Sequence, residues 1–315
     1  MQFTADILGN GFEQLTISQP DDYEGAVVCT LIRKTCAAPS CKGVLYVHGY
    51  NDYFFQEEMA AAYLNRGYNF YALDLRKYGR SYRPHQLFNH TLDLSEYYAD
   101  ITDAIAIMRQ EGNTTIILSG HSNGGLTMAL FAHDHKGKGL FDGLFLNSPF
   151  FDMPMNAFVK KLLVPMIVRR GAREPAKLLK MGFNEVYGHS LHKEKRGEWS
   201  YNTNWKPHIS PGLSYGWFRA VRIGQARVAK GLVIDKPVLI MHAANTVLPK
   251  KWTDKAFTAD VILDQRQIRR GAAKIKGDVT VIAVQDGVHD LILSRADVRE
   301  RVYQQLFSWL DSYHY

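Results

Sequence analysis

The chain has 315 residues, of which 46% are hydrophobic and 22% are charged, and its formal net charge is +7. This composition provides enough apolar material for a large core and excludes a disordered chain. No apolar run reaches the roughly 18 residues of a membrane-spanning helix, and the first residues lack the pattern of a signal peptide, so a cytoplasmic protein is expected.

Two β-strands are predicted at the start of the chain, over residues 12–18 and 26–33. The turn signal Pro20-Asp21-Asp22 lies between them. Because a turn signal between two strand-like runs favours antiparallel pairing, the two strands are expected to form a hairpin.

Short, nearly continuous apolar runs then alternate with helical patterns. Strands are predicted over residues 44–47, 70–73, 116–118, 144–146, 238–241 and 279–284. Helices are predicted over residues 55–66, 95–110, 123–133, 264–274 and 296–310. Apolar strands separated by helices are typical of a mostly parallel sheet with helices on both faces, so the sequence predicts an α/β fold.

The alternation stops in the middle of the chain. Residues 151–235 look helical, aromatic and basic, with 15 Lys and Arg but only 5 Asp and Glu over residues 153–235. We interpret 151–235 as a helical cap above the carboxyl ends of the strands, inserted into a core of residues 1–150 and 236–315. An irregular part of the core is the alternative.

The basic character of this middle segment suits an anionic substrate or a weak contact with anionic lipid. A solvated basic surface without a partner is the alternative. No nucleic-acid-binding motif accompanies the charge, so no nucleic-acid partner is expected.

The strongest motif is Gly120-His121-Ser122-Asn123-Gly124, which fits the pattern G-x-S-x-G. A predicted strand precedes it and a predicted helix follows it, which is the context that a nucleophile turn requires. The glycines leave room for a tight turn, and the turn exposes the serine hydroxyl next to the amino end of a helix. Ser122 is therefore predicted to be a catalytic nucleophile.

Three further stretches carry a family resemblance: Leu45-Tyr46-Val47-His48-Gly49-Tyr50-Asn51, Leu73-Asp74-Leu75-Arg76-Lys77-Tyr78-Gly79-Arg80-Ser81 and Gly287-Val288-His289-Asp290. With the nucleophile turn, they resemble the α/β-hydrolase superfamily, in its serine-aminopeptidase-like branch of monoacylglycerol lipases and lysophospholipases. The resemblance covers residues 12–150 and 236–312 and implies an α/β-hydrolase fold, in which the middle segment would be a cap inserted after the sixth predicted strand. No Cys/His spacing and no glycine-rich phosphate loop is present, so no metal or cofactor is expected. The resemblance also implies an oxyanion hole formed by the backbone N–H groups of Tyr50 and Asn123.

The general base is expected to be His289. In this fold the catalytic residues follow one another in the order serine, acid, histidine, and His289 lies in the last turn before the closing helix. His48 lies at the end of an early strand and is expected to support its loop instead.

The acid of the triad is harder to place, because no carboxylate follows the strand at 238–241 where the family has one. The stretch Ala259-Asp260-Val261-Ile262-Leu263-Asp264 resembles the family's acid motif, displaced by an insertion of about fifteen residues. Asp260 is therefore the predicted acid. Asp264, which also begins a capping box with Gln267, and Asp152 are the alternatives.

These residues predict a serine hydrolase that cleaves a carboxylic ester through an acyl-enzyme on Ser122. The resemblance implies a lipid-like substrate, a monoacylglycerol or a lysophospholipid. Two alternatives stay open: a proline-releasing aminopeptidase, and a catalytically silent binding protein, for which the missing carboxylate is the main support.

Overall fold

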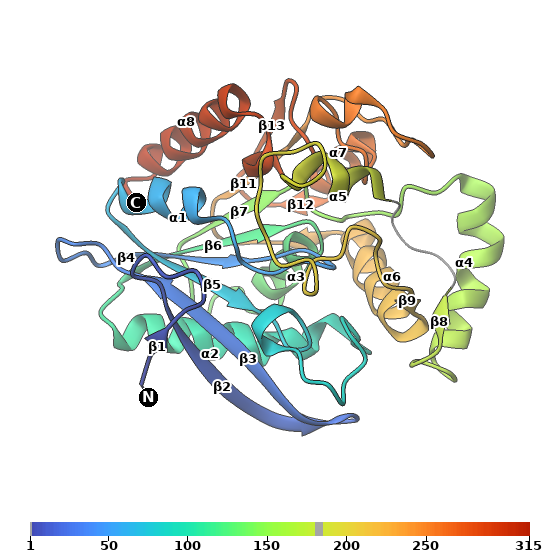
Figure 1. The fold of residues 1–315 in the computed structure, drawn as a ribbon, viewed down its shortest axis with the longest axis horizontal. Coiled ribbons are helices and arrows are strands. Elements are labelled where there is room, and N and C mark those ends of the chain that lie inside the picture. Colours follow the sequence, from blue (N-terminus) through green and yellow to red (C-terminus); the bar gives the residue numbers. More distant parts are fainter. Residues whose placement is uncertain (1, 180–184) are drawn as a thin grey trace.

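The computed structural model describes residues 2–179 and 185–315, and its centre is one large twisted sheet (Figure 1). Nine strands of the described chain follow one another in the order β1-β2-β3-β5-β4-β6-β7-β11-β13. Their bounds are β1 (Thr4–Ala5), β2 (Glu13–Asp22), β3 (Gly25–Lys34), β4 (Lys42–Val47), β5 (Tyr68–Asp74), β6 (Thr115–His121), β7 (Gly143–Asn147), β11 (Val238–Ala243) and β13 (Val279–Val284). The pairs from β1 to β5 are antiparallel and the others are parallel, so the predicted mostly parallel sheet is confirmed.

The predicted hairpin is formed by β2 and β3, but its turn lies later than expected. Asp22 pairs with Gly25, so Tyr23 and Glu24 make the turn, and Gly25 has a φ of +93°. The signal at Pro20 marks a shift of register between Gln19 and Asp22 instead. Proline has no N–H for the ladder, and the irregularity accommodates it within a continuing strand.

Helices cover both faces of the sheet. They are α1 (Glu57–Leu64), α2 (Tyr97–Gln110), α3 (Asn123–Asp134), α7 (Gln265–Ala272) and α8 (Ala296–Ser312), with short 3-10 turns η1 (Gly79–Ser81), η2 (Leu94–Glu96), η3 (Asp254–Phe257) and η4 (Leu291–Leu293). In β4, Val44 and Tyr46 join the core beneath α1 and α8, whereas Leu45 and Val47 join the core beneath α2 and α3. Both faces are buried, which explains why the strands read as continuous apolar runs.

The segment between β7 and β11 contains α4 (Ala157–Gly171), β8 (Leu178–Leu179), α5 (Glu185–Leu191), β9 (Leu213–Ser214), α6 (Tyr215–Lys230) and β10 (Leu232–Val233). It follows β7, which is the sixth of the predicted strands, as expected; the two-residue β1, which has no recognisable sequence pattern, adds one to the count. Trp217 and Phe218 of α6 are buried in the core beneath α2 and α3, and β10 pairs with β12 (Ile275–Lys276). The predicted cap boundary stays a prediction, and 180–184 lie outside the described residues. None of the described helices combines the length and apolarity needed to cross a membrane.

Candidate active site

A sharp turn at the end of β6 presents Ser122 at the start of α3. Ser122 has a φ of +52° and a ψ of −113°, a backbone conformation that a non-glycine residue rarely adopts. A Cβ atom on Gly120 would lie 2.7 Å from the carbonyl oxygen of Gly124, and one on Gly124 would lie 2.3 Å from that of His48. The glycine spacing of the motif is therefore a steric requirement of this turn.

Ser122, His289 and Asp260 form one continuous chain of hydrogen-bonding groups. The hydroxyl oxygen of Ser122 lies 3.0 Å from Nε2 of His289, and Nδ1 of His289 lies 2.9 Å from Oδ2 of Asp260. All three residues are buried, and Asp260 is fully so. With its proton on Nδ1, His289 donates to Asp260 and accepts from the hydroxyl of Ser122, which is the arrangement that activates a serine.

Asp260 reaches His289 through a long loop that returns to the end of β11. The loop leaves the strand at residue 244, passes through η3 and comes back so that Asp260 N–H donates to the carbonyl oxygen of Asn245 at 2.9 Å. The N–H of Val247 donates in turn to the carbonyl oxygen of Asp260 at 3.0 Å. The acid thus lies beside the strand end where the family has one, although it comes later in sequence.

The second carboxylate oxygen of Asp260 is held by the backbone. Oδ1 accepts hydrogen bonds from the N–H groups of Ile262 at 2.7 Å and Leu263 at 2.8 Å. Hydrogen bonds to the ionised form stabilise a buried carboxylate, so the loop both positions Asp260 and keeps it able to accept from His289.

Neither alternative acid contacts His289. Asp264 is the N-cap of α7, where its side chain accepts from the N–H of Arg266 at 2.9 Å. The second hydrogen bond of the predicted capping box, from the N–H of Asp264 to Oε1 of Gln267, is absent. This oxygen has no hydrogen-bond partner among the described residues. Asp152 forms ion pairs with Lys160 and Arg222 instead.

The loop after β4 passes directly beside Ser122. A Cβ atom on Gly49 would lie 3.1 Å from Cβ of Ser122, so a larger residue here would push the two loops apart by a few tenths of an ångström. Tyr50 follows Gly49, and its ring packs 4.2 Å from that of Trp217. Asn123 is the first residue of α3, where backbone N–H groups have no acceptor within the helix.

Two further side chains, His48 and Asp74, brace these loops. His48 has Nδ1 at 2.7 Å from the carbonyl oxygen of Gly49, and its Nε2 accepts from the N–H of Leu75 at 3.1 Å. Burial lowers the pKa of His48, which keeps the ring neutral for both bonds. Asp74 accepts from the N–H groups of Phe54 and Arg80 and pairs with the Arg80 guanidinium.

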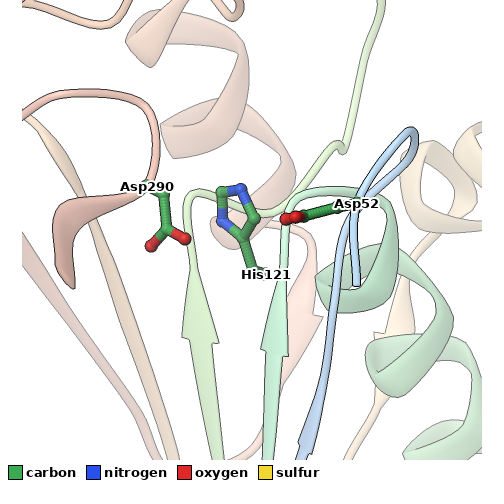
Figure 2. A group of neighbouring side chains, drawn as sticks. All are labelled: Asp52, His121 and Asp290. Atoms are coloured by element: carbon green, nitrogen blue, oxygen red, sulfur yellow. The ribbon is translucent and has the colours of Figure 1, made fainter. Parts of the chain in front are cut away.

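A polar wall beside the triad was not predicted. Asp52, His121 and Asp290 each offer one potential metal ligand atom, and these atoms lie within 4.8 Å of one another. Figure 2 shows the imidazole of His121 between the two carboxylates. Nζ of Lys206 donates to Asp52 at 2.7 Å, and the side-chain amide of Asn147 donates to Asp290 at 2.6 Å. Protein groups thus already compensate much of the negative charge of this wall.

Burial controls the protonation of the wall. It raises the pKa of Asp290, an effect that Lys206 and Asn147 oppose. Burial also lowers the pKa of His121 well below its usual value, and the neighbouring His289 adds to this effect. His121 is therefore neutral near pH 7. One member of the wall had a local signal, because Asp290 follows directly on His289, whereas no local pattern pointed to Lys206.

A pocket opens onto Ser122 and His289 between the sheet and the segment that follows β7. Asp52 and His121 of the polar wall and Lys206 form part of its lining. The less polar side chains in the lining are those of Tyr50, Phe150, Tyr187, Tyr201, Pro207, Ile262 and Leu263. Residues from both sides therefore surround any group that reaches the serine hydroxyl.

Comparison with known proteins gives a family and a fold. A family model described as Serine aminopeptidase, S33 matches residues 38–293. A search of curated proteins with the sequence finds no match.

The fold is that of solved lipases and esterases. A soluble variant of monoglyceride lipase from Saccharomyces cerevisiae, in complex with a substrate analog, has a TM-score of 0.69 and 16% identity over 94% of both chains. Monoacylglycerol lipase from Paleococcus ferrophilus has a TM-score of 0.66 and 21% identity, over 90% of this chain and 98% of that one. An esterase from Thermogutta terrifontis has a TM-score of 0.58 and 18% identity, over 96% and 99%. At these identities the likeness establishes the α/β-hydrolase fold alone.

Proposed function

The chain belongs to the serine aminopeptidase S33 family, and we propose that it is a serine hydrolase that cleaves a carboxylic ester through an acyl-enzyme on Ser122. The observation that carries the proposal is the continuous chain of contacts from Ser122 through His289 to Asp260, at 3.0 and 2.9 Å. A buried serine, histidine and carboxylate in this order are what nucleophilic acyl transfer needs.

In the proposed reaction, Oγ of Ser122 attacks the ester carbonyl carbon while Nε2 of His289 takes the hydroxyl proton. Asp260 accepts from Nδ1 and stabilises the imidazolium that forms. The N–H groups of Tyr50 and Asn123 stabilise the oxyanion of the tetrahedral intermediate. His289 then gives its proton to the departing alkoxide. Water repeats the sequence on the acyl-enzyme, with His289 again as base, and releases the acid.

The pocket supports an uncharged, lipid-like ester. Among its described lining residues, Lys206 is the one Lys or Arg side chain, and Asp52 holds its ammonium at 2.7 Å. A phosphate-bearing head group would find no uncompensated cation there, which favours a monoacylglycerol over a lysophospholipid. The two monoacylglycerol lipases of the same fold point in the same direction.

We also propose that residues 151–235 act as a cap and that α4 makes a weak contact with anionic lipid. Four apolar side chains of α4 expose between 48% and 71% of their surface: Phe158, Leu162, Leu163 and Met166. The same helix carries Lys160, Lys161, Arg169 and Arg170. Exposed apolar groups interleaved with cations suit the surface of a negatively charged membrane.

Vesicle sedimentation tests the cap contact. The wild-type protein should sediment with phosphatidylglycerol vesicles more than with phosphatidylcholine vesicles, and the double variant Leu162→Gln/Met166→Gln should lose this difference. Ile7→Gln, an equally exposed apolar site far from α4, is the matched control and should not. Equal sedimentation of the wild type and the double variant contradicts the contact.

The two alternatives have less support. A silent binding protein was suggested by the missing carboxylate, and Asp260 now occupies that place beside His289. A proline-releasing aminopeptidase needs free carboxylates for the substrate amine. The acidic residues Glu174, Glu185, Glu194, Glu198 and Asp235 do not line the pocket, and Lys206 already neutralises Asp52.

A substrate panel tests the proposed function. The protein should hydrolyse p-nitrophenyl esters and a monoacylglycerol, with a kcat/KM at least tenfold higher than for lysophosphatidylcholine, and should not cleave proline p-nitroanilide. Ser122→Ala is the control for contaminating activity. Cleavage of the anilide without any ester hydrolysis would replace the proposal with the aminopeptidase.

A further inference from the structure

Asn147, the last residue of β7, is bonded to the turn that carries the nucleophile. Its backbone carbonyl oxygen accepts from the N–H of Ser122 at 3.0 Å and lies 3.2 Å from Nδ1 of His121. Because burial keeps His121 neutral, one proton on Nδ1 serves this contact. Asn147 itself is 1% exposed, so water does not replace these bonds.

The side chain of Asn147 is bonded to the turn that carries the general base. Its Nδ2 donates to Oδ1 of Asp290 at 2.6 Å, and its Oδ1 accepts from the N–H of Leu291 at 3.3 Å. Asp290 and Leu291 are the two residues that follow His289. In Figure 2 the end of β7 lies between the turn with Asp290 and the strand with His121.

We infer that Asn147 is a positioning residue for the reaction at Ser122, because it holds the turn of His289 in register with the turn of Ser122. The inference rests on the proposed function. The contact between Ser122 and His289 joins residues 167 positions apart, and it needs both turns to keep their places to within a fraction of an ångström. A single buried residue whose backbone bonds to one turn and whose side chain bonds to the other is suited to this task.

Asp290, the partner of Asn147, receives no hydrogen bond from another side chain among the described residues. Asp290 is fully buried, and its Oδ2 has no hydrogen-bond partner among the residues that the structure describes. Removing the amide of Asn147 would leave Oδ1 without a side-chain donor as well, which a buried carboxylate tolerates poorly. The turn after His289 would then have to move to find water or another donor.

A reciprocal exchange of the two side chains tests the inference. Asn147→Asp places two carboxylates face to face and should lower kcat about 10–100-fold with little change in KM, because the base is misplaced and the pocket is not. In the double variant Asn147→Asp/Asp290→Asn, the amide at 290 can donate to the carboxylate at 147, whose second oxygen can still accept from Leu291. We expect kcat to return to within about threefold of the wild type.

Asn113→Asp is the matched control. Asn113 is also a buried asparagine, with side-chain bonds to Asn69, Tyr71 and Met108, and it lies outside the site. Its variant should lose stability without a selective loss of kcat. Wild-type kcat in Asn147→Asp overturns the inference. So does a double variant that folds and stays as slow as Asn147→Asp, since the charge of Asp290 and not the bond would then matter.

Hydrogen exchange separates this inference from the proposed function. Amides of residues 287–293 should exchange faster in Asn147→Asp than in the wild type and return to the wild-type rate in the double variant, whether or not the protein hydrolyses esters. A wild type without ester hydrolysis removes the proposed function, whereas unchanged exchange in Asn147→Asp removes the positioning role.

Discussion

The turn that carries Ser122 and the loop that carries Asp260 place their residues in the same site, but different contacts determine their shapes. The nucleophile turn is short, and contacts within and beside it determine its shape, such as the close approach of Gly124 to the carbonyl oxygen of His48. The acid loop runs from residue 244 to residue 264, and bonds between its two ends, such as that from Asp260 N–H to Asn245, close it.

The difference shows where each region is vulnerable. In the nucleophile turn, neighbouring backbone atoms leave no room for a methyl group on Gly120 or Gly124, so the turn tolerates no added side-chain volume there. In the acid loop, residues such as Ile262 and Leu263 are buried, and hydrogen bonds between its two ends close the loop. Loss of a polar group at the closing point should therefore disturb it most. Substitutions that add volume should therefore affect the first region, and substitutions that remove polar groups should affect the second.

The largest effect is expected at the end of the acid loop. Asp260→Asn should lower kcat about 10³–10⁴-fold with the fold intact, because the amide cannot stabilise the imidazolium of His289. Asp264→Asn is the matched control, since its side chain caps α7 and pairs with Arg266 without contacting His289, and its kcat should stay within about twofold of the wild type. Steady-state kinetics on one p-nitrophenyl ester measure both. The reverse order of effects would assign the acid to Asp264.

The next largest effect tests the crowding of the nucleophile turn. Gly124→Ala should destabilise the protein by at least about 2 kcal/mol and remove most activity, because its Cβ would meet backbone oxygens at 2.3 and 2.5 Å. Gly125→Ala should cost less, since its Cβ would meet its nearest atom, in Pro149, at 3.0 Å. Urea denaturation gives both free energies of unfolding. Equal stabilities for the two variants would argue against a steric limit at Gly124.

A smaller effect is expected where the acid loop closes. The hydroxyl of Thr246 donates to the carbonyl oxygen of Leu263 at 3.1 Å and accepts from the N–H of Gln265 at 2.9 Å. Thr246→Val keeps the shape and removes both bonds, so it should lower stability by about 1–2 kcal/mol and kcat a few-fold. Thr246→Ser should retain the bonds and most of the activity. If valine and serine behave alike, the loop does not depend on this hydroxyl.

The smallest effect concerns pH near the acid loop. His242 is buried at the end of β11, and burial lowers its pKa below the ordinary value of 6.5. The unfolded chain therefore binds a proton at a higher pH than the folded protein does. Stability from this group is complete above about pH 6.5 and declines as the pH falls toward the lower folded value.

The melting temperature of the wild type should therefore fall between pH 7.5 and pH 5.5, and it should fall less in His242→Gln. His314→Gln, at an exposed position near the carboxyl end, should retain the wild-type response. An identical decline in wild type and His242→Gln would show that other groups carry the pH dependence.

The same contrast explains what the sequence could predict. Ser122 and its glycines form a local pattern because the steric requirement acts between near neighbours. His289 could be placed by chain order, and Asp260 by a motif at the far end of an insertion. Lys206 and Asp52 are 154 positions apart in the sequence, and Asn147 and Asp290 are 143 positions apart. No local sequence pattern could therefore predict these two contacts. The hairpin turn was misplaced because Pro20, read as a turn residue, lies in an irregular strand.

Reaction with a fluorophosphonate probe tests the central claim most directly. The wild-type protein should form one covalent adduct, which peptide mass spectrometry should locate on Ser122, and Ser122→Ala should abolish it. Asp260→Asn should slow the labelling strongly while Asp264→Asn should not. A folded wild-type protein that does not react, or that reacts at a residue other than Ser122, would contradict the account.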